Sequence, residues 1–239
     1  MLSPYGLDII ESCLTCKIRA EPLFCHVPAP ALQAFETIKC ASAYPKGTVL
    51  FMEGQIPRGI FVVCQGTVKL SACATHGRTL ILKLTEPGEV LGLSDALSGN
   101  RYEFTAETIQ PSQVNFVKRG DFLCFLKQFP QVCFKVVETL SEKYNRVWQE
   151  IRSFGLSHSA GERLAKLLVQ WGSKNGQWDQ QEPRIKLAIT HEEIGQIIGA
   201  SRETVTRAFA QLRKQQIVHL KGATLVVHNK AALKRIANS

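Results

Sequence analysis

One stretch of the chain, residues 190–215 with the sequence THEEIGQIIGASRETVTRAFAQLRKQ, predicts two short helices joined by a tight turn. Thr190 is a favourable N-cap, and Glu193 three residues later completes a capping box. Gly199 suits the left-handed conformation that ends a helix, and Ser201 suits the N-cap of the next one. Apolar residues recur at intervals of three and four in both helices, so each helix has one face for a core.

The second predicted helix carries polar residues on the face opposite that core, namely Arg202, Glu203, Thr206 and Arg207. An arginine can donate two hydrogen bonds to the O6 and N7 edge of guanine, and a glutamate can accept one from the N4 amino group of cytosine. A helix that presents both at its N-terminal end suits the major groove of DNA. The alternative is an ordinary surface helix in which Glu203 and Arg207 form an i,i+4 pair.

The run ITHEEIGQIIGASRETVTRAFAQLRKQ resembles the helix-turn-helix of the cyclic AMP receptor protein/FNR (CRP/FNR) superfamily of transcription regulators. The following run, IVHLKGATLVV, resembles the winged hairpin of that family. The resemblance implies that the chain binds double-stranded DNA and works with RNA polymerase. It implies a TGTGA-like half-site, because an arginine at the first base-reading position resembles the cyclic AMP receptor branch. The DNA-binding residues implied are Ser201, Arg202, Glu203, Thr204, Thr206 and Arg207.

The charge of the chain is concentrated in its C-terminal quarter. The 239 residues are enough for two domains and have a net charge of +9. Residues 185–239 hold nine lysines or arginines against three glutamates, a net charge of +6. A local basic field of this kind attracts the phosphate backbone of DNA and speeds encounter with it.

The sequence indicates a cytoplasmic protein. No apolar run of about eighteen residues is present, so we expect no membrane span. The start, MLSPYGLDIIESC, has no basic region followed by an apolar core, which a secretory signal would need. In a reducing compartment we expect the eight cysteines to be thiols or metal ligands rather than structural disulfides.

Residues 1–30 form a cysteine-rich segment, in which Cys13, Cys16 and Cys25 have the spacing C-x2-C-x8-C. Thiolates are soft ligands that suit zinc or an iron–sulfur cluster. The segment is also rich in prolines, including Pro28 and Pro30, which favour an irregular lobe over a continuous helix. Three cysteines that serve only as small buried apolar residues are the alternative.

Its position before a CRP/FNR-like body makes this segment similar to the N-terminal cysteine cluster by which FNR-type regulators hold an oxygen-labile [4Fe–4S] cluster. The gap between Cys16 and Cys25 is longer than in the best-known FNR pattern. The fourth FNR cysteine aligns here with Asn115. A non-cysteine ligand such as His26 is one replacement, and five further cysteines are others: Cys40, Cys64, Cys73, Cys124 and Cys133. The sequence does not choose among them, and a zinc site or a thiol redox switch remains an alternative to the cluster.

Residues 31–128 alternate short apolar runs with glycines, which predicts an antiparallel roll or barrel. The runs PKGTVLFMEGQ, GIFVVCQGTVKL and PGEVLGLSDALSG resemble the β-roll of cyclic-nucleotide-binding domains. In members that bind a nucleotide, a glutamate holds the ribose and an Arg-Ser or Arg-Thr pair holds the phosphate. Here Leu93 takes the place of the glutamate, and Arg101 lies one or two places from the phosphate-binding position. Without the bidentate arginine contact we expect no cyclic nucleotide to bind.

The alternative from a different class of protein is an enzyme that holds a metal ion inside the roll. Such a site needs several histidines or carboxylates. The roll segment contains only one histidine, His76, and the chain lacks a P-loop, a dinucleotide fingerprint and a catalytic-triad order. We therefore expect no enzymatic activity.

Residues 129–156 predict a long helix that starts at Phe129-Pro130, because proline is favoured in a first helical turn. Apolar residues step along it by three and four, the spacing of a coiled coil. The alternatives are a helix lying on the roll of its own chain and a helix that pairs two chains about a twofold axis, which would place two recognition helices on an inverted repeat. The family resemblance favours the homodimer, with an interface of Val136, Leu140, Tyr144, Val147, Ile151 and Phe154.

These patterns together predict an α+β protein with a β-roll, a long dimerisation helix and a winged helix-turn-helix in residues 157–239, after a glycine- and serine-rich hinge. The function expected is transcription regulation by a homodimer under the control of an oxygen- or redox-sensitive iron–sulfur cluster. The alternative is a regulator whose roll binds a small organic effector or haem, with cysteines that are structural, zinc-binding or a thiol switch.

Overall fold

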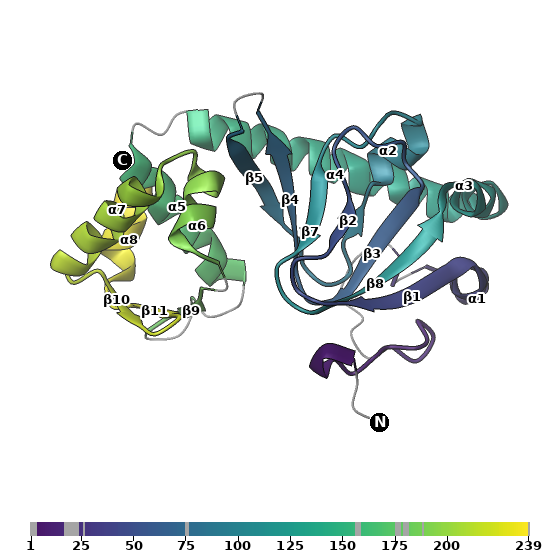
Figure 1. Ribbon diagram of the computed structural model, residues 1–239, viewed down its shortest axis with the longest axis horizontal. Helices are drawn as coiled ribbons and strands as arrows, with labels where there is room; N and C mark the ends of the chain where they lie inside the picture. The colour runs from purple at the N-terminus through teal and green to yellow at the C-terminus, as the bar shows by residue number, and fades with distance from the viewer. Residues whose placement is uncertain are drawn as a thin grey trace. The chain divides into compact units, whose positions relative to one another are not determined.

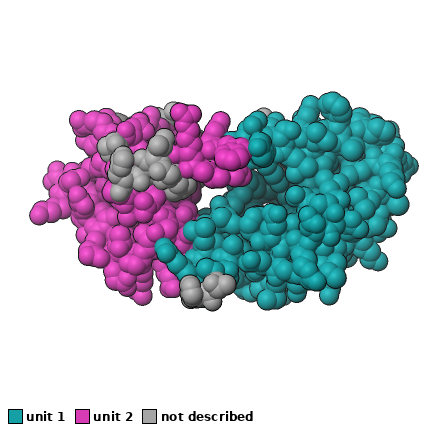
Figure 2. All heavy atoms as spheres, turned by 90° about the horizontal axis from the view of Figure 1, so that it is seen from above, with its two compact units in different colours: residues 1–146 teal, residues 147–239 magenta. Residues whose placement is uncertain are grey.

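The computed structural model describes residues 4–16, 24–25, 27–74, 77–155, 159–174, 178, 182–187 and 189–238. The chain forms two compact units, residues 1–146 and residues 147–239 (Figure 2). The predicted α+β architecture is confirmed, with a roll, a long helix and a winged helix-turn-helix. The boundary between the two units falls inside the long helix, and each unit is described by itself.

The first unit is a roll of two antiparallel four-stranded sheets with helices on the outside of one of them (Figure 1). The first sheet has the order β1-β8-β3-β6 and consists of β1 (Lys39–Tyr44), β8 (Ser112–Lys118), β3 (Gly59–Gln65) and β6 (Val90–Leu91). The second has the order β2-β7-β4-β5 and consists of β2 (Val49–Phe51), β7 (Thr105–Thr108), β4 (Val68–Cys73) and β5 (Thr79–Leu84). The helices are η1 (Pro4–Gly6), α1 (Ala29–Ile38), α2 (Leu93–Ser98), α3 (Arg119–Gln128) and the long α4 (Pro130–Gly155).

Strand β3 shows how the roll obtains two cores. Ile60 and Val62 point outward to the helices, while Phe61 and Val63 point into the roll, as the two-residue period of a strand requires. We call the two groups of buried residues the outer core and the inner core. Both faces of this strand are buried, which explains its nearly unbroken apolar sequence.

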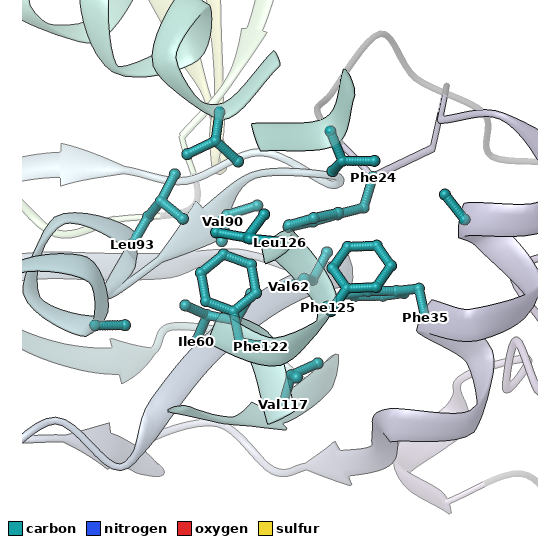
Figure 3. Close-up of a cluster of buried hydrophobic side chains, with 14 residues drawn as sticks. Phe24, Phe35, Ile60, Val62, Val90, Leu93, Val117, Phe122, Phe125 and Leu126 are labelled. Atoms are coloured by element: carbon teal, nitrogen blue, oxygen red, sulfur yellow. The ribbon is translucent and has the colours of Figure 1, made fainter. Parts of the chain in front are cut away.

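The outer core is built on phenylalanine rings, and one of them comes from the cysteine-rich segment (Figure 3). Phe24 is only 3% exposed, and its ring stacks on Phe35 of α1 with the centroids 4.6 Å apart. The ring centroids of Phe35 and Phe125 of α3 are 5.7 Å apart. Those of Phe125 and Phe129, just before α4, are 5.2 Å apart. We call these four residues the ring row. It connects the residue next to Cys25 with the start of the long helix.

The prediction of an irregular lobe up to residue 30 is wrong at its C-terminal end. Helix α1 begins at Ala29, with Pro28 as its N-cap and Pro30 in its first turn. The missing N–H of a proline costs nothing there, because the first N–H groups of a helix have no intrahelical acceptor. Helices α1, α2 and α3 were not expected from the sequence, which favoured strands throughout this region.

Helix α4 begins at Pro130 as predicted, but its first turns belong to the outer core. Val132 and Val136 are each 1% exposed, and Leu140 packs partly buried against the same core. The alternative weighed for this helix, that it lies on the roll of its own chain, is therefore correct for its first half. Among the described residues no helix is both long and apolar enough to cross a membrane.

The second unit joins a helical bundle to a three-stranded antiparallel sheet of order β10-β11-β9. Its elements are α5 (Ala160–Lys174), β9 (Arg184–Lys186), α6 (His191–Ile198), α7 (Arg202–Lys214), β10 (Val218–Lys221), β11 (Thr224–Val227) and α8 (Lys230–Ala237). Buried aliphatic residues from α5, α6, β11 and α8 form its interior with Phe209 of α7. Helix α8, which was not predicted, packs against α5.

Candidate functional site

The turn between α6 and α7 has the geometry that its capping residues predict. Thr190 Oγ1 accepts from the Glu193 N–H at 3.2 Å, and Glu193 Oε2 accepts from the Thr190 N–H at 2.8 Å, so the capping box is confirmed. Gly199 is left-handed, with φ 66° and ψ 38°. Ser201 Oγ accepts from the Thr204 N–H at 3.2 Å and caps α7.

Gly195 of α6 makes this turn compact, and the sequence reasoning missed it. Its carbonyl accepts from the Ala200 N–H at 2.8 Å. A Cβ at this position would lie 2.6 Å from the Ala200 carbonyl oxygen, so the space is closed to any larger residue. The available signal was a glycine inside a helix with a regular apolar stripe, which usually has a packing reason.

The exposed side chains at the start of α7 are the charged ones. Arg202, Glu203 and Arg207 are all on the surface, directly after the cap. The pKa of Glu203 is held below its usual value, first by a bond to its own backbone N–H and then by the Ser201 hydroxyl and the charges of Arg202 and Arg207. The surface therefore offers two guanidinium donors and one ionised acceptor at a helix N-terminus, the set that base edges in a major groove require.

The hydroxyl residues of the predicted set have structural roles in this turn. Ser201 and Thr204 hold the cap, with their hydroxyl oxygens 3.0 Å apart. Thr206 Oγ1 donates to the Arg202 carbonyl at 2.9 Å and lies 3.0 Å from His191 Nδ1. These three residues therefore orient the helix, and their contact with DNA stays a prediction.

His191 joins the two helices and was also missed by the sequence reasoning. Its ring stacks on Phe209, with the centroids 4.9 Å apart and the planes 13° apart. Burial, and then the charges of Arg202 and Arg213, lower the pKa of His191. A neutral histidine therefore packs beneath the charged surface. Helix α5 supports α6 from the other end, where Arg163 Nε donates to the Ile198 carbonyl at 2.7 Å.

The predicted wing is the hairpin of β10 and β11, with the register Lys221↔Thr224 at its tip. Gly222 takes the left-handed conformation in the turn, with φ 61°. Lys221 is exposed beside it, so the tip carries a positive charge that can contact a phosphate.

Aromatic side chains fill the interior of the roll. Tyr102 is 2% exposed, stacks on Phe51 at 4.1 Å and donates its hydroxyl proton to the Gly59 carbonyl at 2.8 Å. Leu93 is buried in the outer core. Arg101 donates from Nη1 to the Gly54 carbonyl at 2.7 Å. Arg101, the arginine closest in sequence to the expected phosphate-binding position, is thus bonded to a backbone carbonyl. Leu93, which takes the place of the ribose-binding glutamate, is apolar and buried.

Comparison with known proteins agrees with this architecture. The Crp-like helix-turn-helix domain matches residues 162–236, and the cyclic nucleotide-binding domain matches residues 42–129. The chain belongs to the CRP/FNR family of transcription regulators. Regulators of the CRP/FNR family bind DNA and act as dimers.

Two curated relatives and one solved structure illustrate the range of the CRP/FNR family. The nitrogen fixation regulation protein FixK of Bradyrhizobium diazoefficiens is 25% identical over 233 residues, which is 98% of this chain and 92% of the relative. The CRP-like cAMP-activated global transcriptional regulator of Mycobacterium tuberculosis is 25% identical over 194 residues, 81% of this chain and 86% of the relative. The structure of FixK2 from Bradyrhizobium japonicum has a TM-score of 0.72 at 24% identity and covers 83% of this chain and 97% of its own.

The cysteine-rich segment of this CRP/FNR protein is docked on the first sheet of the roll. The Cys13 N–H donates to Glu36 Oε2 of α1 at 2.9 Å. Gln113 of β8 exchanges two hydrogen bonds with the backbone of Ile10, at 2.8 and 2.7 Å. Asn115 Nδ2 donates to Cys13 Sγ at 3.7 Å, so the FNR-aligned position does lie beside a cysteine of the segment.

The thiols of the segment are half-buried in this structure. Burial raises the pKa of Cys13 to about 11, so its thiol is a poor nucleophile as it stands. Within the described parts of the chain, no three His, Cys, Asp or Glu side chains are close enough to hold a metal ion without rearrangement. Cys16 and Cys25 are half-buried as well, while His26 lies outside the described residues. Four of the remaining cysteines are exposed: Cys40, Cys73, Cys124 and Cys133.

The expected dimer surface of α4 needs a correction. Val136 is buried against the roll of its own chain, so it is not open to a partner, and Leu140 packs partly buried against the same core. Tyr144, Val147 and Ile151 are between 50% and 63% exposed, as a partner surface requires. Three further apolar residues of α4 that were not in the predicted set are exposed: Phe134, Val137 and Trp148. The side chain of Phe154 lies outside the described residues.

Proposed function

We propose that the chain is a homodimeric transcription regulator that binds an inverted-repeat DNA site of the TGTGA type, under the control of an iron–sulfur cluster at its N-terminal cysteines. The observation that carries the DNA part is the exposed Arg202, Glu203 and Arg207 at the capped start of α7. A bidentate pair between a side chain and a base discriminates by about 1–3 kcal/mol, so these three residues are enough to choose among half-sites.

The homodimer is supported by the exposed apolar stripe of α4. Phe134, Val137 and Ile151 are 70%, 54% and 55% exposed on a helix of 26 residues. Burying one such side chain is favourable by about 1.5–3 kcal/mol. A second copy of the chain presents the same stripe, and twofold pairing would give the two recognition helices that an inverted repeat needs.

The cluster is supported by the chemistry and the docking of the cysteine-rich segment. Three thiols lie within a short segment that is anchored by Phe24 in the outer core and by hydrogen bonds to β8. Thiolates are the ligands that hold iron–sulfur clusters. Cys13 also receives an N–H bond from Asn115, and hydrogen bonds to sulfur are one of the means by which proteins tune such clusters.

A cyclic nucleotide fits the roll of this chain poorly. The roll interior is packed with Phe51, Phe61 and Tyr102. Arg101 is bonded to a backbone carbonyl and Leu93 is buried, so neither the phosphate nor the ribose has its partner. An anionic phosphate in this interior would lose its charge-assisted bonds.

The test is the visible spectrum, the iron and sulfide content and the DNA affinity of protein purified without oxygen. We expect a brown protein that bleaches in air and whose affinity for a TGTGA palindrome changes as it bleaches. Cys16→Ala should remove the colour and the response to air, while the matched variant Cys124→Ala, an exposed cysteine of α3, should keep both. A colourless, iron-free wild type that still binds DNA would refute the cluster and leave the DNA-binding part in place.

A further inference from the structure

A β-bulge at Cys64 distinguishes this cysteine from the other four outside the segment. In the pairing of β3 with β8, Val63 is opposite Val114 and Gln65 is opposite Gln113, so Cys64 has no opposite residue. A bulge of this kind re-aims side chains and often occurs next to functional sites. Cys64 is half-buried.

The bulge lies directly under the cysteine-rich segment. Gln65 Nε2 donates to the Asp8 carbonyl and also lies 3.4 Å from Gln113 Oε1. Gln113 in turn holds the backbone of Ile10. The segment therefore crosses the sheet at the two residues that pair beside Cys64.

Asn115, which aligns with the fourth cysteine of FNR-type regulators, faces the cysteine-rich segment. Asn115 pairs with Val62, whose side chain lies in the outer core, so both point to the face of the sheet that carries the segment. Asn115 is 1% exposed, and its Nδ2 donates to Cys13 Sγ at 3.7 Å. Its Oδ1 is buried and has no hydrogen-bond donor among the residues that the structure describes. Asn115 therefore places a buried polar side chain against Cys13 on that face of the sheet.

Phe24, the residue before Cys25, packs into the outer core on the same face of the sheet. Phe24 is stacked on Phe35 and edge-on to Phe122, with centroids 4.6 and 6.0 Å apart. This anchor fixes the backbone next to Cys25 over the outer core. Phe24 and Val62 share the outer core, so the backbone next to Cys25 and the strand that carries Cys64 meet at one face of the first sheet.

We propose that Cys64 is the fourth ligand of the iron–sulfur cluster, together with Cys13, Cys16 and Cys25, in place of the cysteine that FNR-type proteins have at the position of Asn115. This inference rests on the proposed function, because it names the remaining ligand of the same site. Each cysteine binds as a thiolate and releases its proton to solvent, and the positive iron ions replace the proton as the partner of the buried sulfur. Asn115 remains as an N–H donor to Cys13.

Four proteins, prepared without oxygen and supplied with ferrous iron and sulfide, test this assignment: the wild type, Cys64→Ala, Cys40→Ala and the double variant Cys64→Ala with Asn115→Cys. Cys40 is the matched control, since it lies on the same sheet but is exposed and pairs with the inward-facing Phe116. The readouts are iron and sulfide per chain, the electron paramagnetic resonance spectrum after reduction, and the rate at which a chelator removes iron.

We expect the wild type and Cys40→Ala to hold about four iron ions per chain. Cys64→Ala should lose iron to the chelator at least about 10-fold to 100-fold faster, because even an indirect ligand partner has an effect of that size. The double variant should regain slow loss, because Asn115 already touches the Cys13 sulfur. Its recovery also shows that the Cys64→Ala chain folds.

Two results would overturn the inference in different ways. If Cys64→Ala keeps its iron and its spectrum like Cys40→Ala, Cys64 is not a ligand and the proposed cluster stands with another. If the wild type takes up no iron under the same conditions, the cluster and its fourth ligand are both refuted.

Discussion

The substitution Gly195→Ala sets two effects of opposite sign against each other in the helix-turn-helix. Alanine is favoured over glycine in a helix interior by about 1 kcal/mol, which alone would stabilise α6. The new Cβ, however, would lie 2.6 Å from the Ala200 carbonyl oxygen and 3.4 Å from the Ser201 carbonyl carbon. These are backbone atoms of the turn, so no side chain can rotate away.

Relief of that contact requires the turn, and with it the start of α7, to move. Overpacking of this kind costs about 1–3 kcal/mol, so we expect a net loss of stability of up to about 2 kcal/mol after the helical gain. The displacement also moves the Ser201 cap and the neighbouring Arg202, so specific DNA affinity should fall by more than stability alone explains. Urea unfolding followed by circular dichroism gives the change in stability, and fluorescence anisotropy with a palindromic duplex gives the change in DNA affinity.

Gly161→Ala is the matched control in the same unit. A Cβ there meets only Ser159 Oγ at 3.7 Å, which is ordinary contact, so this variant should be neutral or slightly stabilised and should bind DNA normally. If Gly195→Ala is as stable as Gly161→Ala and binds as well, the close approach of α6 to the turn is not what fixes the recognition helix, and the reasoning fails.

Three further predictions concern base recognition, pairing of the chains and pH. Arg202→Ala should weaken binding by about 1–3 kcal/mol and relax one base position in a set of substituted duplexes, whereas an equal loss on every sequence would mean a phosphate contact. Phe134→Glu, at an exposed position, should shift the mass in analytical ultracentrifugation from dimer to monomer without unfolding the protein. Val136→Ala, in the outer core, should instead lower the free energy of unfolding by about 1.5–3 kcal/mol. The reverse pattern would mean that Val136 pairs the chains and Phe134 stabilises the fold. Burial and the charges of Arg202 and Arg213 lower the pKa of His191 from its usual 6.5, so its contribution to stability is present above pH 6.5 and is lost as the pH falls through 6.5 toward the lowered value. The unfolding midpoint of His191→Phe, which keeps the ring stack, should therefore fall less between about pH 7 and about pH 5.5 than that of the wild type, and equal falls would contradict this.

The parts of the fold that could be predicted were those with a local cause. Thr190, Glu193 and Gly199 determine the ends of α6 through hydrogen bonds within a few residues of sequence, and Pro130 determines the start of α4 in the same way. Such signals do not depend on the rest of the chain. The strands of the roll were equally visible, because glycines separate them.

What could not be predicted depends on contacts between distant residues. Val136 and Tyr144 both belong to the three-and-four pattern of apolar residues along α4, yet Val136 packs on the roll and Tyr144 is exposed, a difference that the spacing does not show. The side chains of Thr206 and His191 meet across a turn, which periodicity does not show. Likewise, the proposal of Cys64 among five cysteines rests on strand register and on a bulge, both of which are set by partner strands.

If the proposed cluster acts on α4 through the ring row, the row sets an upper limit on the signal of one subunit. The signal would then change how well Phe24 is seated, and a seated phenylalanine is worth about 3–5 kcal/mol. Turning a protein from 99% off to 99% on takes about 5.5 kcal/mol. One Phe24 therefore gives a graded response, while two of them acting on one paired assembly exceed the threshold. A complete switch in this protein would thus be a property of two subunits that change together.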